Sequence, residues 1–121
     1  MYNRDLRPSE VGITKLTSKL FPLAALHLIE YLIGNIFIKK NHGGPTSTER
    51  HVGDLGNIEA GSDGKVVTVL SDSLASLFGE NTIIGKAIVI HSGEDDLGLG
   101  GNVGSLTTGN AGSRVGCCLI K

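Results

Sequence analysis

The sequence predicts an all-β domain of the antiparallel sandwich or barrel type, preceded by an apolar helical segment. Short β-branched runs bounded by Gly, Asp and Ser are typical of strands. Two glycine-rich stretches of about 20 residues each separate these runs, and loops of that length are usually functional or disordered. Short strands that carry long loops indicate a sandwich or barrel. The 121 residues allow one such domain at most.

The chain changes character near residue 40. Residues 1–40 contain two of the 18 glycines, with six basic and three acidic side chains. Residues 41–121 contain the other 16 glycines, with five basic and nine acidic side chains. We therefore treat 1–40 as a leader and 41–121 as the β domain. The net charge of −1 argues against a nucleic-acid partner, because such proteins normally carry a basic excess.

An almost continuously apolar stretch, residues 20–38, dominates the leader. Its length approaches that of a membrane-spanning helix, but His27 and Glu30 near its middle would be costly in hydrocarbon. We favour a buried or partner-seeking helix over 23–37 rather than a membrane span, with His27 as a packing residue and not a ligand. The leader lacks the pattern of a secretory signal, so we expect a cytoplasmic protein.

Two β-branched runs are the clearest strand candidates in the second part. They are K-V-V-T-V-L at 65–70 and K-A-I-V-I-H at 86–91. Further candidates are shorter: 73–78, 82–84 and a last strand at 117–120. The glycine-rich loops cover 41–64 and 92–112, and functional side chains are expected there.

His42, His51 and Asp54 lie in the first of these loops. Two imidazoles and a carboxylate can bind a tetrahedral cation such as zinc. Their spacing of nine and then three residues allows a folded-back loop to bring them together. The alternative is that they are ordinary polar residues of a surface loop, since spacing alone indicates no fourth ligand.

Further candidate residues follow the 86–91 run. His91 ends that run and could point into a site, although a half-buried histidine bonded to backbone is the simpler reading from spacing alone. Asp95 and Asp96 could orient a ligand histidine or form a solvated turn. Arg114 could attract a small anion or clamp loop carbonyls. Cys117 and Cys118 are adjacent, so a bridge between them would be strained.

Five motifs of the second part occur in the same order and with the same separation in a known family. They are H-G-G-P at 42–45, R-H-V-G-D-L-G-N-I at 50–58, G-K-A-I-V-I-H at 85–91, D-D-L-G-L-G-G-N at 95–102 and G-N-A-G-S-R-V-G-C at 109–117. Over about residues 40–120 the sequence therefore resembles copper–zinc superoxide dismutase.

The resemblance assigns metal ligands. It implies that His42, His51 and Asp54 bind zinc and that His91 binds copper. Asp95 resembles the carboxylate that ties a zinc-ligand histidine to a copper-ligand histidine. The implied fold is the Greek-key β-sandwich of this family, here in partial form behind an unrelated leader.

The resemblance also implies a substrate and further roles. Arg114 resembles the arginine beside copper that binds superoxide, which the family converts to oxygen and hydrogen peroxide. Cys117 resembles the cysteine that bridges to a partner in the zinc-loop region. Homodimers are usual in the eukaryotic family, so a homo-oligomer is expected.

The sequence departs from the family in its first part. The bridging histidine shared by copper and zinc would stand eight residues before His42, where this chain has Gly34. No His-x-His pair occurs, so His91 is the one family copper ligand that the motifs retain. Cys117 lacks its upstream partner cysteine. These departures favour zinc over copper as the bound metal and argue against dismutase activity in this chain.

Three hypotheses remain open from the sequence. The chain is a superoxide dismutase; or it is a non-catalytic zinc-binding relative that associates with full-length chains; or it is a membrane-associated or non-functional product of a replaced leader. A partial sandwich would expose strand edges and an apolar face, so we expect association or aggregation.

Overall fold

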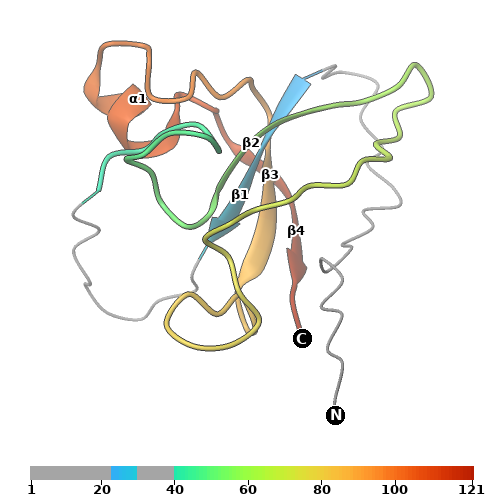
Figure 1. Ribbon diagram of the computed structural model, residues 1–121. Helices are drawn as coiled ribbons and strands as arrows, with labels where there is room; N and C mark the ends of the chain where they lie inside the picture. Colours follow the sequence, from blue (N-terminus) through green and yellow to red (C-terminus); the bar gives the residue numbers. More distant parts are fainter. Residues whose placement is uncertain (1–22, 30–39) are drawn as a thin grey trace.

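The computed structural model of the protein describes residues 23–29 and 40–121. The elements in this part are β1 (Leu23–Ile29), β2 (Asp54–Glu59), β3 (Ala87–His91), α1 (Val103–Thr108) and β4 (Arg114–Leu119). The strands form one antiparallel sheet in the order β2-β1-β3-β4 (Figure 1). The described residues are therefore mainly β, as the sequence predicts, and their one helix has six residues.

The prediction of a helix over 23–37 is wrong for residues 23–29, which form β1. The rest of that stretch lies outside the described residues. β1 is a central strand that pairs with β2 on one side and with β3 on the other. A strand buried on both faces reads as a continuous apolar run, which periodicity cannot distinguish from a buried helix.

A small hydrophobic core lies on one face of the sheet. Leu26 of β1 packs there with Ile58, Ile88 and Ile90 from its neighbours and with Val66 from the segment after β2. The opposite face of β1 and β3 carries Ala25, His27, Val89 and His91, all of them buried. Because successive residues of a strand point to opposite faces, the core fixes which face the two histidines occupy.

The other strand predictions have mixed outcomes. The 86–91 run is confirmed as β3, and the last strand, predicted at 117–120, is β4 and begins at Arg114. The 65–70 run is not a strand in the structure, and the 73–78 and 82–84 candidates contribute a single isolated bridge between Ser76 and Thr82. β2 and α1 were not predicted, because both lie in stretches rich in Gly, Asp and Asn.

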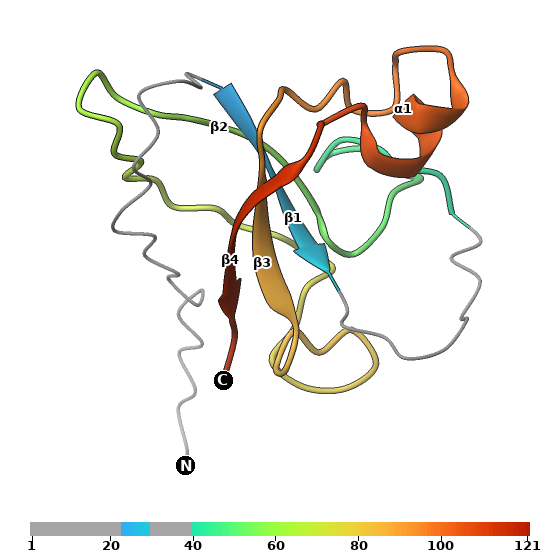
Figure 2. The ribbon, with the colours of Figure 1, turned by 180° about the vertical axis from the view of Figure 1, so that it is seen from behind.

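The first glycine-rich loop and the loop that contains α1 lie together at one end of the sheet. The teal segment after residue 40 runs beside α1 in both views (Figures 1 and 2), and the His42 N–H donates to the Leu106 carbonyl at 2.8 Å. Register irregularities lie just before His27 in β1 and just before His91 in β3. No helix among the described residues has the length and apolarity needed to cross a bilayer.

Candidate metal centre

Asp54, the first residue of β2, organises the first loop. Its Oδ2 accepts hydrogen bonds from the backbone N–H groups of Gly43 at 3.0 Å and His51 at 2.8 Å. Its Oδ1 faces two imidazole nitrogens, Nδ1 of His42 at 2.9 Å and Nδ1 of His51 at 3.2 Å. The structure thus brings together the three zinc ligands predicted from the sequence.

The other nitrogen of each imidazole is already bonded. Nε2 of His51 lies 2.8 Å from the Lys40 carbonyl oxygen, and Nε2 of His42 lies 2.7 Å from Oδ1 of Asp95. A carbonyl or carboxylate oxygen can only accept, so both Nε2 atoms carry hydrogen. In the neutral rings Nδ1 then holds the lone pair, and Nδ1 of His42 is buried without a hydrogen-bond partner.

Two imidazole Nδ1 atoms, of His42 and His51, therefore face the same oxygen of Asp54, an arrangement that a bound cation would stabilise. Burial lowers the pKa of His42, but the carboxylates of Asp54 and Asp95 outweigh it and raise that pKa to about 9. The hydrogen bond with Asp54 raises the pKa of His51 against the effect of burial. Burial opposes ionisation of Asp54, yet the two imidazoles hold its pKa well below the usual range. The donor set, two nitrogens and one carboxylate oxygen, fits zinc with one position open.

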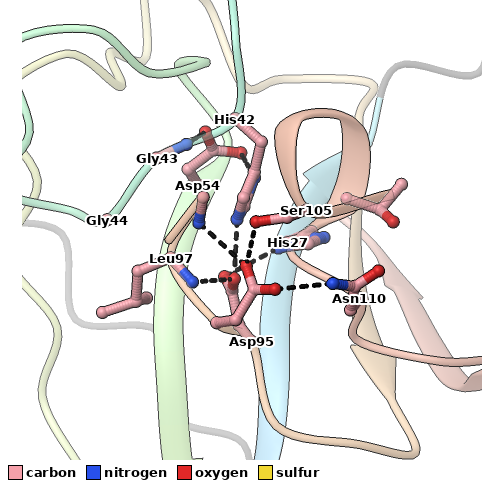
Figure 3. Close-up of polar contacts among 12 residues, drawn as sticks. His27, His42, Gly43, Gly44, Asp54, Asp95, Leu97, Ser105 and Asn110 are labelled. Carbon is pink, nitrogen blue, oxygen red and sulfur yellow. Dashed lines mark hydrogen bonds and ion pairs between the residues drawn. The ribbon is translucent and has the colours of Figure 1, made fainter. Parts of the chain in front are cut away.

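Asp95 connects this cluster to β1 (Figure 3). Its buried carboxylate contacts Nε2 of His42 through Oδ1 and Nε2 of His27 through Oδ2, the latter at 3.3 Å. Burial raises the pKa of Asp95, but the two histidines reverse this and lower it to about 2. Asn57 of β2 holds the Asp95 backbone, donating to its carbonyl at 2.9 Å and accepting from its N–H at 2.8 Å.

His27 is buried, as its interpretation as a packing residue predicts, and its Nε2 also contacts the Asp95 carboxylate. His27, His42 and Asp54 form a buried group whose ligand atoms all lie within 4.8 Å of one another. The His27 ring centroid also lies 5.1 Å from that of His42 and 4.8 Å from that of His91. The strand alternation of β1 directs His27 toward the site, whereas a helix would have left its direction open.

His91 ends β3 beside His27. Its Nδ1 donates to the Gly112 carbonyl at 3.1 Å, while its Nε2 is buried with no hydrogen-bond partner. Burial lowers the pKa of His91, and the charges of His27 and Arg114 act in the same direction. His91 is therefore neutral near pH 7 with a free lone pair on Nε2, which is the state that a metal requires.

Two predicted residues lie on β4. Arg114 is exposed and pairs across the sheet with His91. Cys117 and its neighbour Cys118 are exposed free thiols. Asp96, considered beside Asp95, instead holds its own loop: it accepts from Ser105 at 2.7 Å and from Asn110 at 2.6 Å.

Comparison with known families decides the lineage. The sequence profile of the family described as "Copper/zinc superoxide dismutase (SODC)" matches residues 32–120. The chain belongs to this superoxide dismutase family. The resemblance over residues 40–120 is thereby confirmed, and β1 lies ahead of the matched region.

Curated superoxide dismutases agree with this assignment. A "Superoxide dismutase [Cu-Zn]" of Yarrowia lipolytica is 61% identical over 82 residues, which is 68% of this chain and 53% of that protein. "Superoxide dismutase [Cu-Zn] 5" of Dictyostelium discoideum is 55% identical over 68% of this chain and 54% of its own length. The chain thus spans about half the length of the curated superoxide dismutases that it matches.

Two site residues escaped sequence reasoning. His27 lies outside every superoxide dismutase motif. The alternation of strand side chains would have indicated its direction, but an apolar run on both faces does not reveal that alternation. Asn57 lies within a motif, R-H-V-G-D-L-G-N-I, but its spacing from Asp95 gives no hint of their double hydrogen bond. Both are defined by strand pairing, which a single sequence does not display.

Proposed function

We propose that the chain binds zinc through His42, His51 and Asp54, holds copper between His27 and His91, and disproportionates superoxide to oxygen and hydrogen peroxide. The observation that carries this proposal is the Asp95 carboxylate, which contacts one imidazole of each set. Copper would supply the one-electron redox chemistry that zinc lacks. The cytoplasm stays the predicted compartment.

The chain's own residues prepare such a site. Asp95 accepts from Nε2 of His27, which leaves the lone pair of that ring on Nδ1. The Gly112 carbonyl sets the opposite tautomer in His91, with its lone pair on Nε2. Carboxylate and carbonyl acceptors of this kind orient ligand histidines and increase their basicity. The Arg114 guanidinium, exposed beside His91, provides the positive charge that draws in a small anion.

A second candidate function is non-catalytic zinc binding. The full sequence contains four histidines, and the zinc set uses two of them. Two imidazoles remain for copper, whereas a cupric site takes about four nitrogen or oxygen donors. The zinc set, by contrast, is complete enough to bind metal and order the first loop.

Metal loading followed by a superoxide assay separates the two functions. The purified chain is supplied with both metals, its metal content is measured by mass spectrometry, and superoxide decay is followed by stopped flow. We expect one zinc and one copper per chain, with decay accelerated. His91→Ala should lose copper and acceleration but retain zinc, and His51→Ala should lose mainly zinc. Zinc without copper and without acceleration in the unmodified chain would establish the second function and refute the first.

A further inference from the structure

Asp96 follows Asp95 in the chain and makes contacts of its own with the segment that contains α1. Its Oδ1 accepts a hydrogen bond from the Ser105 hydroxyl at 2.7 Å, and its Oδ2 accepts one from the side-chain amide of Asn110 at 2.6 Å. Its backbone N–H donates to the Gly109 carbonyl at 2.8 Å. Bonds this short are typical of hydrogen bonds to an ionised acceptor. One residue therefore holds the end of α1 at three successive points.

Gly109, at the centre of these points, lies directly against the contact between His42 and Asp95. A Cβ on Gly109 would lie 2.6 Å from Nε2 of His42 and closer still to Oδ1 of Asp95. The backbone of Gly109 therefore packs on the hydrogen bond that orients the His42 ring. Ser105 and Asn110 appear in one cluster with His42 and Asp95 (Figure 3). Any movement of Gly109 would change the room that this pair occupies.

α1 also contacts His42 through the backbone. The His42 N–H donates to the carbonyl of Leu106, which belongs to α1, at 2.8 Å. Its neighbour in the helix, Ser105, is 0% exposed, and the Ser105 hydroxyl accepts from the Gly100 N–H at 2.8 Å while it donates to Asp96. The buried hydroxyl thus has both a donor and an acceptor partner, which fixes its direction. The Asp96 carboxylate and the His42 backbone are held to the same turn of helix.

We propose that Asp96 is a positioning residue of the metal centre. Through Ser105 and Asn110 it holds α1 against the pair formed by His42 and Asp95, and it thereby favours the ring orientation in which Nδ1 of His42 faces the metal. Groups that hold a ligand histidine in place in this way increase the affinity of a site for its metal. The inference rests on the zinc binding proposed above and adds to it the residue that couples α1 to the site.

Exchanging the two partners of one hydrogen bond tests the proposal. Asn110→Asp places two carboxylates at hydrogen-bond distance, and their repulsion should release α1. The added negative charge by itself would attract zinc more strongly, so weaker zinc binding would report the lost positioning and not the charge. Adding Asp96→Asn to this variant restores one donor and one acceptor with their roles exchanged. Asn110 has φ +53°, a conformation that Asn and Asp both tolerate, so the backbone accepts either residue.

Zinc affinity is measured by chelator competition in the intact chain. Asn110→Asp should bind zinc about tenfold more weakly than the parent, and the double variant should recover to within about twofold of the parent. Ser105→Ala should weaken zinc binding as well, because it removes the hydroxyl that donates to Asp96. The matched control, Asn81→Asp, adds the same charge in the loop before β3 and should bind zinc like the parent.

Amide hydrogen exchange in the presence of a chelator gives a readout that needs no metal. The His42 N–H should exchange about tenfold faster in Asn110→Asp, return to the parent rate in the double variant, and leave the amides of the sheet core unchanged. A parent chain that does not bind zinc would refute the proposed function, and the exchange of His42 would still decide whether Asp96 holds α1. Equal zinc affinity of parent and Asn110→Asp, unchanged His42 exchange, or no recovery in the double variant would overturn the inference.

Discussion

The lone pairs that converge around Asp54 give the metal-free protein a distinctive dependence on pH. Nδ1 of His42 and Nδ1 of His51 both face Oδ1 of Asp54. Without a metal, protonation gives the imidazoles of His42 and His51 the positive charge that attracts the Asp54 carboxylate. We therefore expect the free energy of unfolding, measured in a chelator, to decrease as the pH rises above neutrality.

The size of this effect follows from His42. Its pKa is 6.5 in an unstructured chain and about 9 in the folded protein. A pKa raised by folding stabilises the protein fully below the lower value, and the stabilisation is lost as the pH rises through the higher one. The difference corresponds to on the order of 3 kcal/mol, a large fraction of the 5–15 kcal/mol typical of a domain. His51 shifts in the same direction, so it adds to the same trend.

Urea unfolding at pH 6, 7.5 and 9 measures the effect, with chelator in one series and saturating zinc in the other. In chelator the midpoint should fall steadily with pH. With zinc it should hold or rise, because the metal displaces the protons and binds more tightly as they leave. His42→Gln should remove most of the pH dependence in chelator. A midpoint in chelator that is flat or rises between pH 6 and 9 would refute the lone-pair argument.

Three further changes probe the frame around the metal centre. Asp95→Asn can no longer accept from two histidines, so zinc and copper affinities measured by chelator competition should each fall about tenfold or more. Gly109→Ala should lower the free energy of unfolding by more than about 2 kcal/mol, because φ is +63° and the added Cβ would collide with Asp95. The control Gly79→Ala has φ +82° but open space around it, so its free energy of unfolding should fall by about half as much in the same urea assay. Arg50→Met breaks the ion pair between the buried Arg50 and the partly buried Asp72 (2.6 Å) and should lower the free energy of unfolding by about 1–3 kcal/mol. Equal thermal unfolding midpoints for variant and parent would contradict this expectation.

His42, His51 and Asp54, which the family resemblance predicts to bind zinc, lie together through contacts that are local in the sequence. His51 and Asp54 are three residues apart, and the turn between them lets the His51 N–H donate to the carboxylate that its ring also faces. His42 joins them through a short, glycine-containing loop whose Gly43 N–H bonds the same carboxylate. Within a dozen residues, the chain needs no long-range information to bring these donors together.

His27 could not be assigned, because its role depends on which element carries it. In a helix over 23–37 its direction would have been set by packing that the sequence does not reveal. In β1, the pairing of Leu26 with Ile90 directs Leu26 to the core, and His27 must then point to the opposite face. The direction of the His27 side chain is thus set by the register of β1 with β3, whose Val89 and Ile90 lie more than 60 residues further along the chain.

The 65–70 run shows the opposite failure. Its β-branched composition predicts a strand, and the described part of the chain gives it no neighbour to pair with. Strand propensity is mainly a preference for packing against a neighbouring strand, so it is realised only where one is supplied. β1 succeeds with weaker composition because β2 and β3 both supply partners.

The position of β1 in the sheet links the fold to the chemistry. β2 and β3 carry the family motifs, yet they do not pair with each other, because β1 lies between them. This central strand precedes the region that matches the family, residues 32–120. It contributes Leu26 to the core on one face and His27 to the candidate metal centre on the other. Leu26→Pro would remove a sheet hydrogen bond and the core contact together, so it should disrupt the fold and abolish copper binding as a consequence. His27→Ala, by contrast, should abolish copper binding and leave both zinc binding and the sheet intact. Loss of zinc in His27→Ala, measured beside unchanged circular dichroism, would show that the two halves of the site are not separable in this way.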